Sequence, residues 1–131
     1  MRSSTYILFI LLFAGSIGFT QDPDAGLEID GLIVDETRTR TGSDFYNLFY
    51  THWEVPPQTC NFTIIIMEQP VPQMGTRITL KINDDEVVQF MLQPRYEVIE
   101  ELAQQSVQFV RQYLYERELM RQRLEREGKL F

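Results

Sequence analysis

The chain has 131 residues, enough for one domain of ordinary size. Acidic side chains outnumber basic ones by 19 to 12, giving a formal net charge of -7 at pH 7. Because binding to nucleic acid requires a basic surface, this balance argues against DNA or RNA as a partner. The sequence holds one cysteine, Cys60, which cannot form an internal disulfide, so packing of the core must stabilise the fold.

An export signal is predicted at the N-terminus. The run from Tyr6 to Phe19 is almost wholly apolar, but it is shorter than the roughly 17 to 25 residues that span a bilayer. Small residues Ser16 and Gly18 stand at the spacing that signal peptidase requires. We therefore expect residues 1–20 to be a cleaved secretory signal peptide, with a single-pass membrane anchor as the alternative. The polar residues 21–30 are expected to form a flexible segment.

Residues 31–41, with the sequence GLIVDETRTRT, predict the first strand. After an apolar start the residues alternate in character, and this places Ile33 and Val34 on opposite faces. The threonines that follow suit a strand with one side open to solvent. We therefore expect an exposed edge strand in this position.

A helix rich in aromatic residues is predicted within TGSDFYNLFYTHWE, residues 41–54. Ser43 or Asp44 can cap its start, and no proline interrupts the run before Pro56, so the helix has about three turns. Five rings bring about 750 to 1,250 Å² of buriable surface to this one element. At helical spacing they form two stripes, the first with Phe45, Phe49 and Trp53 and the second with Tyr46 and Tyr50.

The two aromatic stripes support different interpretations. The stripe of Phe45, together with Leu48, is expected to pack mainly in the core of the domain itself. For the tyrosine stripe and Trp53, a core position and contact with a partner protein are favoured equally, because aromatic residues with a polar atom are enriched at interfaces.

Three further strands are predicted as an antiparallel meander. NFTIIIME, residues 61–68, is apolar on both faces in its middle, so this central strand needs cover on both sides. Glu68 and Pro70 are interpreted as gatekeepers against aggregation. After a loop, RITLKIN points Ile78, Leu80 and Ile82 inward and Arg77, Thr79 and Lys81 outward; an acidic turn follows, and EVVQFMLQP returns as the last strand.

A long helix is predicted from Pro94 to Glu127. At 1.5 Å per residue it would be about 50 Å long, so its first half is expected to pack on the sheet and its second half to project. We place the domain at residues 31–115 and a charged helical tail at residues 116–131. Residues 21–110 carry 5 basic and 15 acidic side chains, and residues 111–131 carry 6 basic and 4 acidic. This asymmetry favours either a solvated, salt-bridged tail or head-to-tail contact between copies.

The sequence offers little material for catalysis. His52 and Cys60 could form a dyad, but no glycine-rich oxyanion loop accompanies them. Zinc requires three or four His or Cys ligands, and the acidic turn at Asp84, Asp85 and Glu86 lacks the spacing of a calcium loop. We therefore expect a protein that acts by contact, without enzymatic activity, cofactor or metal; a ligand-binding or catalytic domain built on His52 and Cys60 is the alternative.

Several ordered stretches within residues 29–100 resemble the family of the curli assembly and transport component CsgE. They are GLIVDETRTRTGSDFYNLFYTHWE, TIIIMEQP, QMGTRITLKIN and EVVQFMLQP. The most specific positions are Gly31-Leu32-Ile33 with Asp35 and Thr37, Gly42, Asp44-Phe45-Tyr46, Trp53, Glu68-Gln69-Pro70, Gly75 to Thr79, Gln89, Leu92 and Pro94. Neither the charged tail after Tyr115 nor Cys60 is explained by this resemblance.

The resemblance implies a fold and a function. The fold class is α+β, a small antiparallel sheet of about four strands packed by the aromatic helix and the long C-terminal helix. The implied function is that of a periplasmic accessory factor that forms a ring-like homo-oligomer, expected to be a nonamer, caps the outer-membrane secretion pore of the curli pathway and holds the unfolded amyloid subunit. A free-standing holdase without pore contact is the second hypothesis. The residues expected to contact proteins are Trp53, Phe45, Phe49, Tyr46, Tyr50, Val88 and Phe90.

Overall fold

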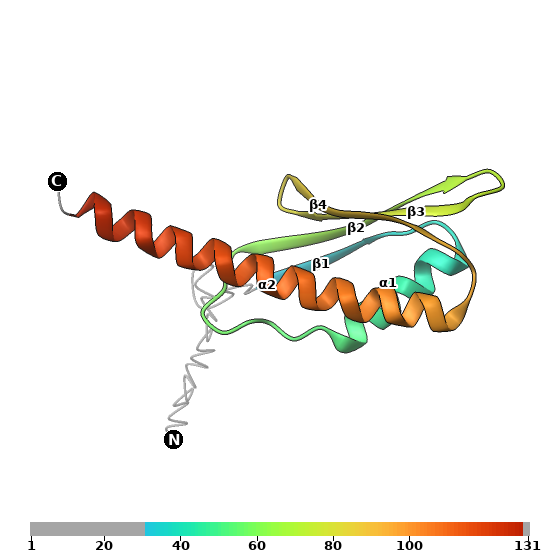
Figure 1. The fold of residues 1–131 in the computed structure, drawn as a ribbon, viewed down its shortest axis with the longest axis horizontal. Coiled ribbons are helices and arrows are strands. Elements are labelled where there is room, and N and C mark those ends of the chain that lie inside the picture. Colours follow the sequence, from blue (N-terminus) through green and yellow to red (C-terminus); the bar gives the residue numbers. More distant parts are fainter. Residues whose placement is uncertain (1–30, 130–131) are drawn as a thin grey trace, which may run out of the picture.

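The computed structural model describes residues 31–129, which form a four-stranded sheet with two helices against it (Figure 1). The predicted signal peptide and the segment 21–30 lie outside the described residues. Neither described helix is both long enough and apolar enough to cross a membrane. In chain order the elements are β1 (Gly31–Glu36), α1 (Arg40–His52), β2 (Phe62–Val71), β3 (Gly75–Ile82), β4 (Asp85–Leu92) and α2 (Tyr96–Gly128).

The sheet has the order β1-β2-β3-β4. The predicted meander of β2, β3 and β4 is antiparallel, and β1 occupies an edge, as expected. The α+β class is confirmed, with one difference in topology: β1 runs parallel to β2, with Ile33 opposite Ile64, so the sheet is mixed. The reason is that α1 crosses back along the sheet, and the chain therefore enters β2 in the direction in which it left β1.

Two element boundaries differ from the sequence-based expectation. Helix α1 begins at Arg40, with Thr39 as its N-cap instead of Ser43 or Asp44. The Thr39 hydroxyl accepts a hydrogen bond of 3.2 Å from the backbone N–H of Gly42. Strand β2 continues through Pro70 into the expected loop. The proline is tolerated because β1 ends opposite Met67, and no other described strand lies beside this side of β2.

One face of the sheet carries the core. Both helices cover this face (Figure 1), and the predicted inward residues Ile78, Leu80 and Ile82 are buried beneath them. On the opposite face, which we call the outer face, Ile65 and Met67 are half-buried, and no helix of residues 31–129 covers them. The expected cover on both faces of β2 is thus provided on one face by the described residues.

Glu68 has a different environment from that expected of a gatekeeper. Its side chain is 6% exposed and accepts hydrogen bonds from the backbone N–H groups of Arg38 (2.6 Å) and Thr39 (2.7 Å). The hydroxyls of Thr39 and Thr76, the latter at 2.7 Å, also donate to it. One carboxylate therefore joins β2, β3 and the start of α1. A Cβ atom at Gly42 would lie 2.2 Å from Glu68 Oε1, so glycine makes room for this contact.

Helix α2 extends well beyond the sheet. Its buried residues are Ile99, Ala103, Ser106, Val107, Val110 and Leu114. Among the described residues after Leu114, none is buried, and the helix continues away from the body as expected (Figure 1). Arg121 forms ion pairs with Glu118 at 2.6 Å and with Glu125, and these i,i+3 and i,i+4 contacts support the projecting turns.

Replacing Gly42 by alanine tests the close approach of α1 to Glu68. The Gly42→Ala side chain would displace a carboxylate held by four hydrogen bonds, so we expect the free energy of unfolding to fall by about 1–3 kcal/mol. Urea unfolding followed by circular dichroism measures this change. Gly128→Ala is the matched control, because a Cβ atom there meets nothing within 4 Å. Equal stability of the two variants would contradict the prediction.

The Glu68 network also predicts a dependence of stability on pH. Burial alone would raise the pKa of Glu68, but its hydrogen bonds from Thr39, Arg38 and Thr76 together lower the pKa below its ordinary value of 4.5. A carboxyl group with a lowered pKa in the folded state contributes stability above pH 4.5, and this contribution is lost as the pH falls through the folded-state pKa.

We therefore expect Glu68→Gln to lower the free energy of unfolding at pH 7 by about 1–3 kcal/mol. The difference between the two proteins should shrink as the pH falls from about 5 to 3, because the wild type then loses its own carboxylate. Urea titrations at a series of pH values measure the two curves. A difference that stays constant over this pH range would show that the charge of Glu68 does not contribute.

Candidate interaction surface

A row of five aromatic rings crosses the core side of the sheet. Phe90 of β4 meets Phe45 edge-on at 5.4 Å between centroids, and Phe45 lies 6.2 Å from Phe49 on α1. Phe49 stacks on Trp53 at 5.6 Å, and Trp53 meets Phe62, at the start of β2, at 6.0 Å. The row connects β4 to the start of β2. The fully buried rings of Phe45 and Phe49 in its middle contact Phe90 and Trp53 and fix their positions.

The outward side of α1 carries the second aromatic stripe. Tyr46 and Tyr50 stack with their ring centroids 6.1 Å apart. Tyr46 is half-buried, and burial together with the nearby charge of Asp35 on β1 raises the pKa of its hydroxyl. Tyr50 is 61% exposed and Trp53 is half-buried. These three side chains, which we call the α1 surface, form an amphipathic aromatic patch beside the β1 half of the sheet.

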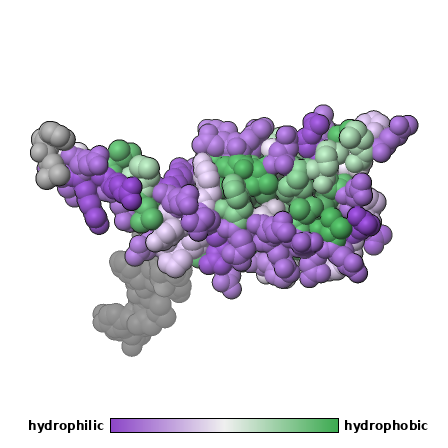
Figure 2. Space-filling model, viewed as in Figure 1, coloured by the Kyte–Doolittle hydropathy of each residue, from purple (hydrophilic) through white to green (hydrophobic). Residues whose placement is uncertain are grey.

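A second apolar surface lies at the opposite edge of the sheet. A hollow of about 410 Å³ opens between β4 and α2, and we call it the β4–α2 groove. Figure 2 shows apolar side chains gathered in this part of the molecule. β4 has a neighbour on one side within the described sheet, so the groove runs along a sheet edge. Its lining residues are Val87, Val88, Gln89, Phe90, Leu102, Gln105, Ser106 and Phe109.

The structure divides the seven residues expected at protein contacts into two groups. Phe45 and Phe49 are fully buried in the core, the position favoured for their stripe by helical spacing, and they have no surface to offer a partner. The remaining five have exposed or half-exposed side chains, and their contact with other proteins stays a prediction. Tyr46, Tyr50 and Trp53 belong to the α1 surface, whereas Val88 and Phe90 line the β4–α2 groove.

Three apolar members of the groove, Val87, Leu102 and Phe109, were not predicted from the sequence. A register shift at Leu80/Lys81 places Val87 as an extra residue in β4, where it packs against the core. Leu102 and Phe109 come from α2, and the exposed Phe109 lies beside the buried stripe of that helix. A bulky aromatic residue outside the core-facing stripe was the available signal for a surface contact.

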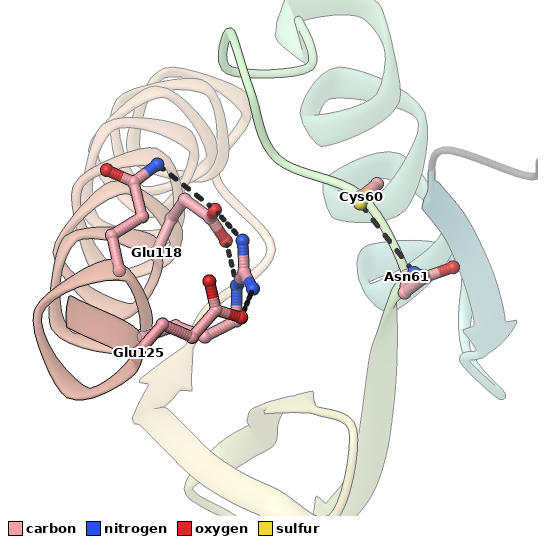
Figure 3. A network of polar contacts seen from close by, with 6 residues as sticks. Cys60, Asn61, Glu118 and Glu125 are labelled. Carbon is pink, nitrogen blue, oxygen red and sulfur yellow. Dashed lines mark hydrogen bonds and ion pairs between the residues drawn. The ribbon is translucent and has the colours of Figure 1, made fainter. Parts of the chain in front are cut away.

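His52 and Cys60, the two residues that could have formed a dyad, lie on different segments of the described chain. Cys60 is exposed, and its thiol sulfur accepts a hydrogen bond of 3.6 Å from the Asn61 side-chain amide. Figure 3 shows this pair on the loop before β2 and Glu118 and Glu125 on α2. Cys60 and Asn61 line one hollow with Glu118 and Arg121, and in the described residues the ion pairs of Arg121 are with Glu118 and Glu125. His52 is exposed at the last position of α1. Within residues 31–129 no three His, Cys, Asp or Glu side chains are placed to hold a metal ion.

Comparison with known proteins agrees with the resemblance noted in the sequence. Residues 29–128 match the family model described as curli assembly protein CsgE. The chain is 38% identical over 68 residues to the curli production assembly/transport component CsgE of Escherichia coli O6:H1, covering 52% of this chain and 50% of that protein. It is 36% identical over 84 residues to the protein of the same description from Salmonella typhi, covering 64% of this chain and 60% of that protein.

The chain thus spans about half to three fifths of the length of the curated relatives that it matches. The family match extends from just before β1 to the last residue of α2, so it includes both surfaces described above. The protein belongs to the curli assembly protein CsgE family.

Proposed function

We propose that this protein is a non-enzymatic periplasmic accessory factor for secretion of the curli amyloid subunit. In this role it caps the outer-membrane secretion pore as a ring-like homo-oligomer and holds the unfolded subunit before export. Family membership supports a role in curli assembly. The observation that carries the finer proposal is the presence of two apolar surfaces, the α1 surface and the β4–α2 groove, beside opposite edges of one small sheet.

Two different surfaces at opposite edges favour a ring over a two-fold dimer. A contact between unlike surfaces is heterologous, and repeating it closes a ring when the rotation per subunit divides a full turn. Trp53 of one copy would then meet Val88 and Phe90 of the next. Aromatic side chains that are half-buried in the monomer fit this role, because completing their burial contributes strongly to association. We propose nine subunits in the ring.

The outer face supports the holding of an unfolded client. It presents Leu32, which is 48% exposed, beside Val34, Ile65 and Met67, on a sheet whose edge strand β1 has no partner strand on one side within the part of the chain that the structure describes. An aggregation-prone chain can cover such a face with its own apolar side chains and pair its backbone with the free strand edge. Both contacts would compete with pairing between client chains.

Co-purification tests contact with the pore. The tagged protein should elute together with the curli-type pore of the same organism from a detergent extract. We expect Trp53→Ala to reduce the co-eluting amount by about tenfold, because one interface aromatic often dominates binding. Tyr96→Ala is the control, since Tyr96 is an exposed aromatic residue that lies at the start of α2, outside both apolar surfaces. Absence of wild-type co-elution, with the protein folded, would refute the capping role.

A free-standing holdase is the second candidate function. The outer face is the observation that favours it, because a client can bind this face without any contact between the protein and a pore. Substoichiometric protein should delay fibrillation of the curli subunit, which thioflavin fluorescence follows. We expect Leu32→Asp to shorten this delay by about half or more, because a charge in the apolar face opposes contact with the client. Met74→Asp is the control, because Met74 is also exposed but lies in the turn after β2. An unchanged delay would exclude the outer face as the client site.

A further inference from the structure

A stripe of side chains runs along one side of α2 from Tyr113, which packs against the core, onto the projecting part of the helix, beneath which no described strand lies. Tyr113, Met120 and Leu124 stand at the spacing that places residues on one side of a helix, and Arg117 lies between them. Leu124 is 61% exposed and Met120 is 53% exposed. Figure 2 shows apolar side chains on this part of the molecule as well. We call these four residues the tail stripe.

The tail stripe and the groove have complementary shapes. The groove is an apolar hollow bounded by a strand on one side and a helix on the other, the form that accepts an amphipathic helix. Its helical wall runs from Leu102 to Phe109, about 10 Å along the axis, and the stripe from Arg117 to Leu124 covers a similar length. Within one molecule the tail leads away from the groove (Figure 1), so the groove that it fills belongs to another copy.

The charges of the two surfaces also favour this contact. Glu86 precedes the groove residue Val87, and Glu101 accepts a hydrogen bond of 3.2 Å from the groove residue Gln105. The tail presents Arg117, Arg123 and Arg126; among residues 31–129 the ion pairs of the tail involve Arg121 alone. An arginine-bearing helix end would therefore meet a groove with acidic borders.

We propose that the projecting end of α2 docks into the β4–α2 groove of a second copy of this chain, with Met120 and Leu124 against Phe90, Leu102 and Phe109. This inference rests on the proposed homo-oligomer and names a contact within it. The geometry is consistent with the Trp53 contact, because Thr59, Cys60 and Asn61, just before β2, line one hollow with Leu114 and Arg117. Trp53, packed on Phe62, and the root of the tail thus lie at the same end of the molecule.

Sedimentation velocity of the purified full-length protein tests the tail. We expect Leu124→Glu to weaken self-association by about tenfold or more, because it places a carboxylate in an apolar contact beside acidic borders. Leu119→Glu is the matched control on the same helix, because Leu119 lies away from the stripe. Leu119 is 39% exposed and Leu124 is 61% exposed, so the control substitution is the one that would disturb folding more. Glutamate preserves helix propensity at both sites. Equal association of the two variants would overturn the proposal.

Cross-linking identifies the occupant of the groove. In a Cys60→Ser background, one copy carries Leu124→Cys and another carries Gln105→Cys, and the two are mixed and oxidised. A disulfide between the unlike copies is expected. Linkage of Leu124→Cys copies to each other alone would show that tails pair with tails and would overturn the proposal, as would the absence of any linkage. Pore co-elution without tail-to-groove linkage would refute this contact and leave the proposed function standing.

Discussion

The buried carboxylate of Glu68 is the interaction on which the arrangement of the fold depends. It lies on β2 and accepts hydrogen bonds from two backbone N–H groups of the segment between β1 and α1. The hydroxyl of Thr76 on β3 donates a further hydrogen bond to it. A negative charge at the start of a helix is favourable because unpaired N–H groups point toward it. Glu68 therefore fixes where α1 begins, and the path of the β1–α1 crossover follows from that position.

The position of α1 in turn determines which aromatic rings are buried and which remain at the surface. With the helix start held against Glu68 and Gly42 admitting close approach, Phe45 reaches Phe90 on β4, and Phe49 fills the core beside it. The same helix rotation turns Tyr50 outward. The α1 surface is thus produced by the contact that builds the core, and a change at Glu68 would alter both.

The sequence predicted those parts of the fold that depend on periodicity. The alternation of Ile78, Leu80 and Ile82 and the four-residue spacing of Phe45 and Phe49 indicated buried faces, because a period of two or of 3.6 identifies a face without reference to distant residues. The parallel pairing of β1, the cap at Thr39 and the burial of Glu68 were not predictable in this way. Each depends on residues about thirty positions apart, and Thr39 is one of several hydroxyl residues that could cap a helix.

The groove was found in part, because Val88 and Phe90 lie on a predicted strand whereas the bulge at Val87 and the neighbouring Phe109 require the tertiary structure.

Placing both helices on one face of the sheet has a consequence for function. Among residues 31–129 a single face of the sheet is covered, which leaves an outer face and two strand edges. Each of these regions retains apolar side chains: Leu32 and Ile65 outside, Tyr50 beside the β1 half, and Phe90 along β4. An isolated small domain would gain stability by covering them, since apolar area removed from water stabilises a fold. Under the proposed function other chains would provide the cover, and the different surfaces would allow a neighbouring copy and an unfolded client to be bound together. In the proposed oligomer, assembly would complete the burial that residues 31–129 leave unfinished.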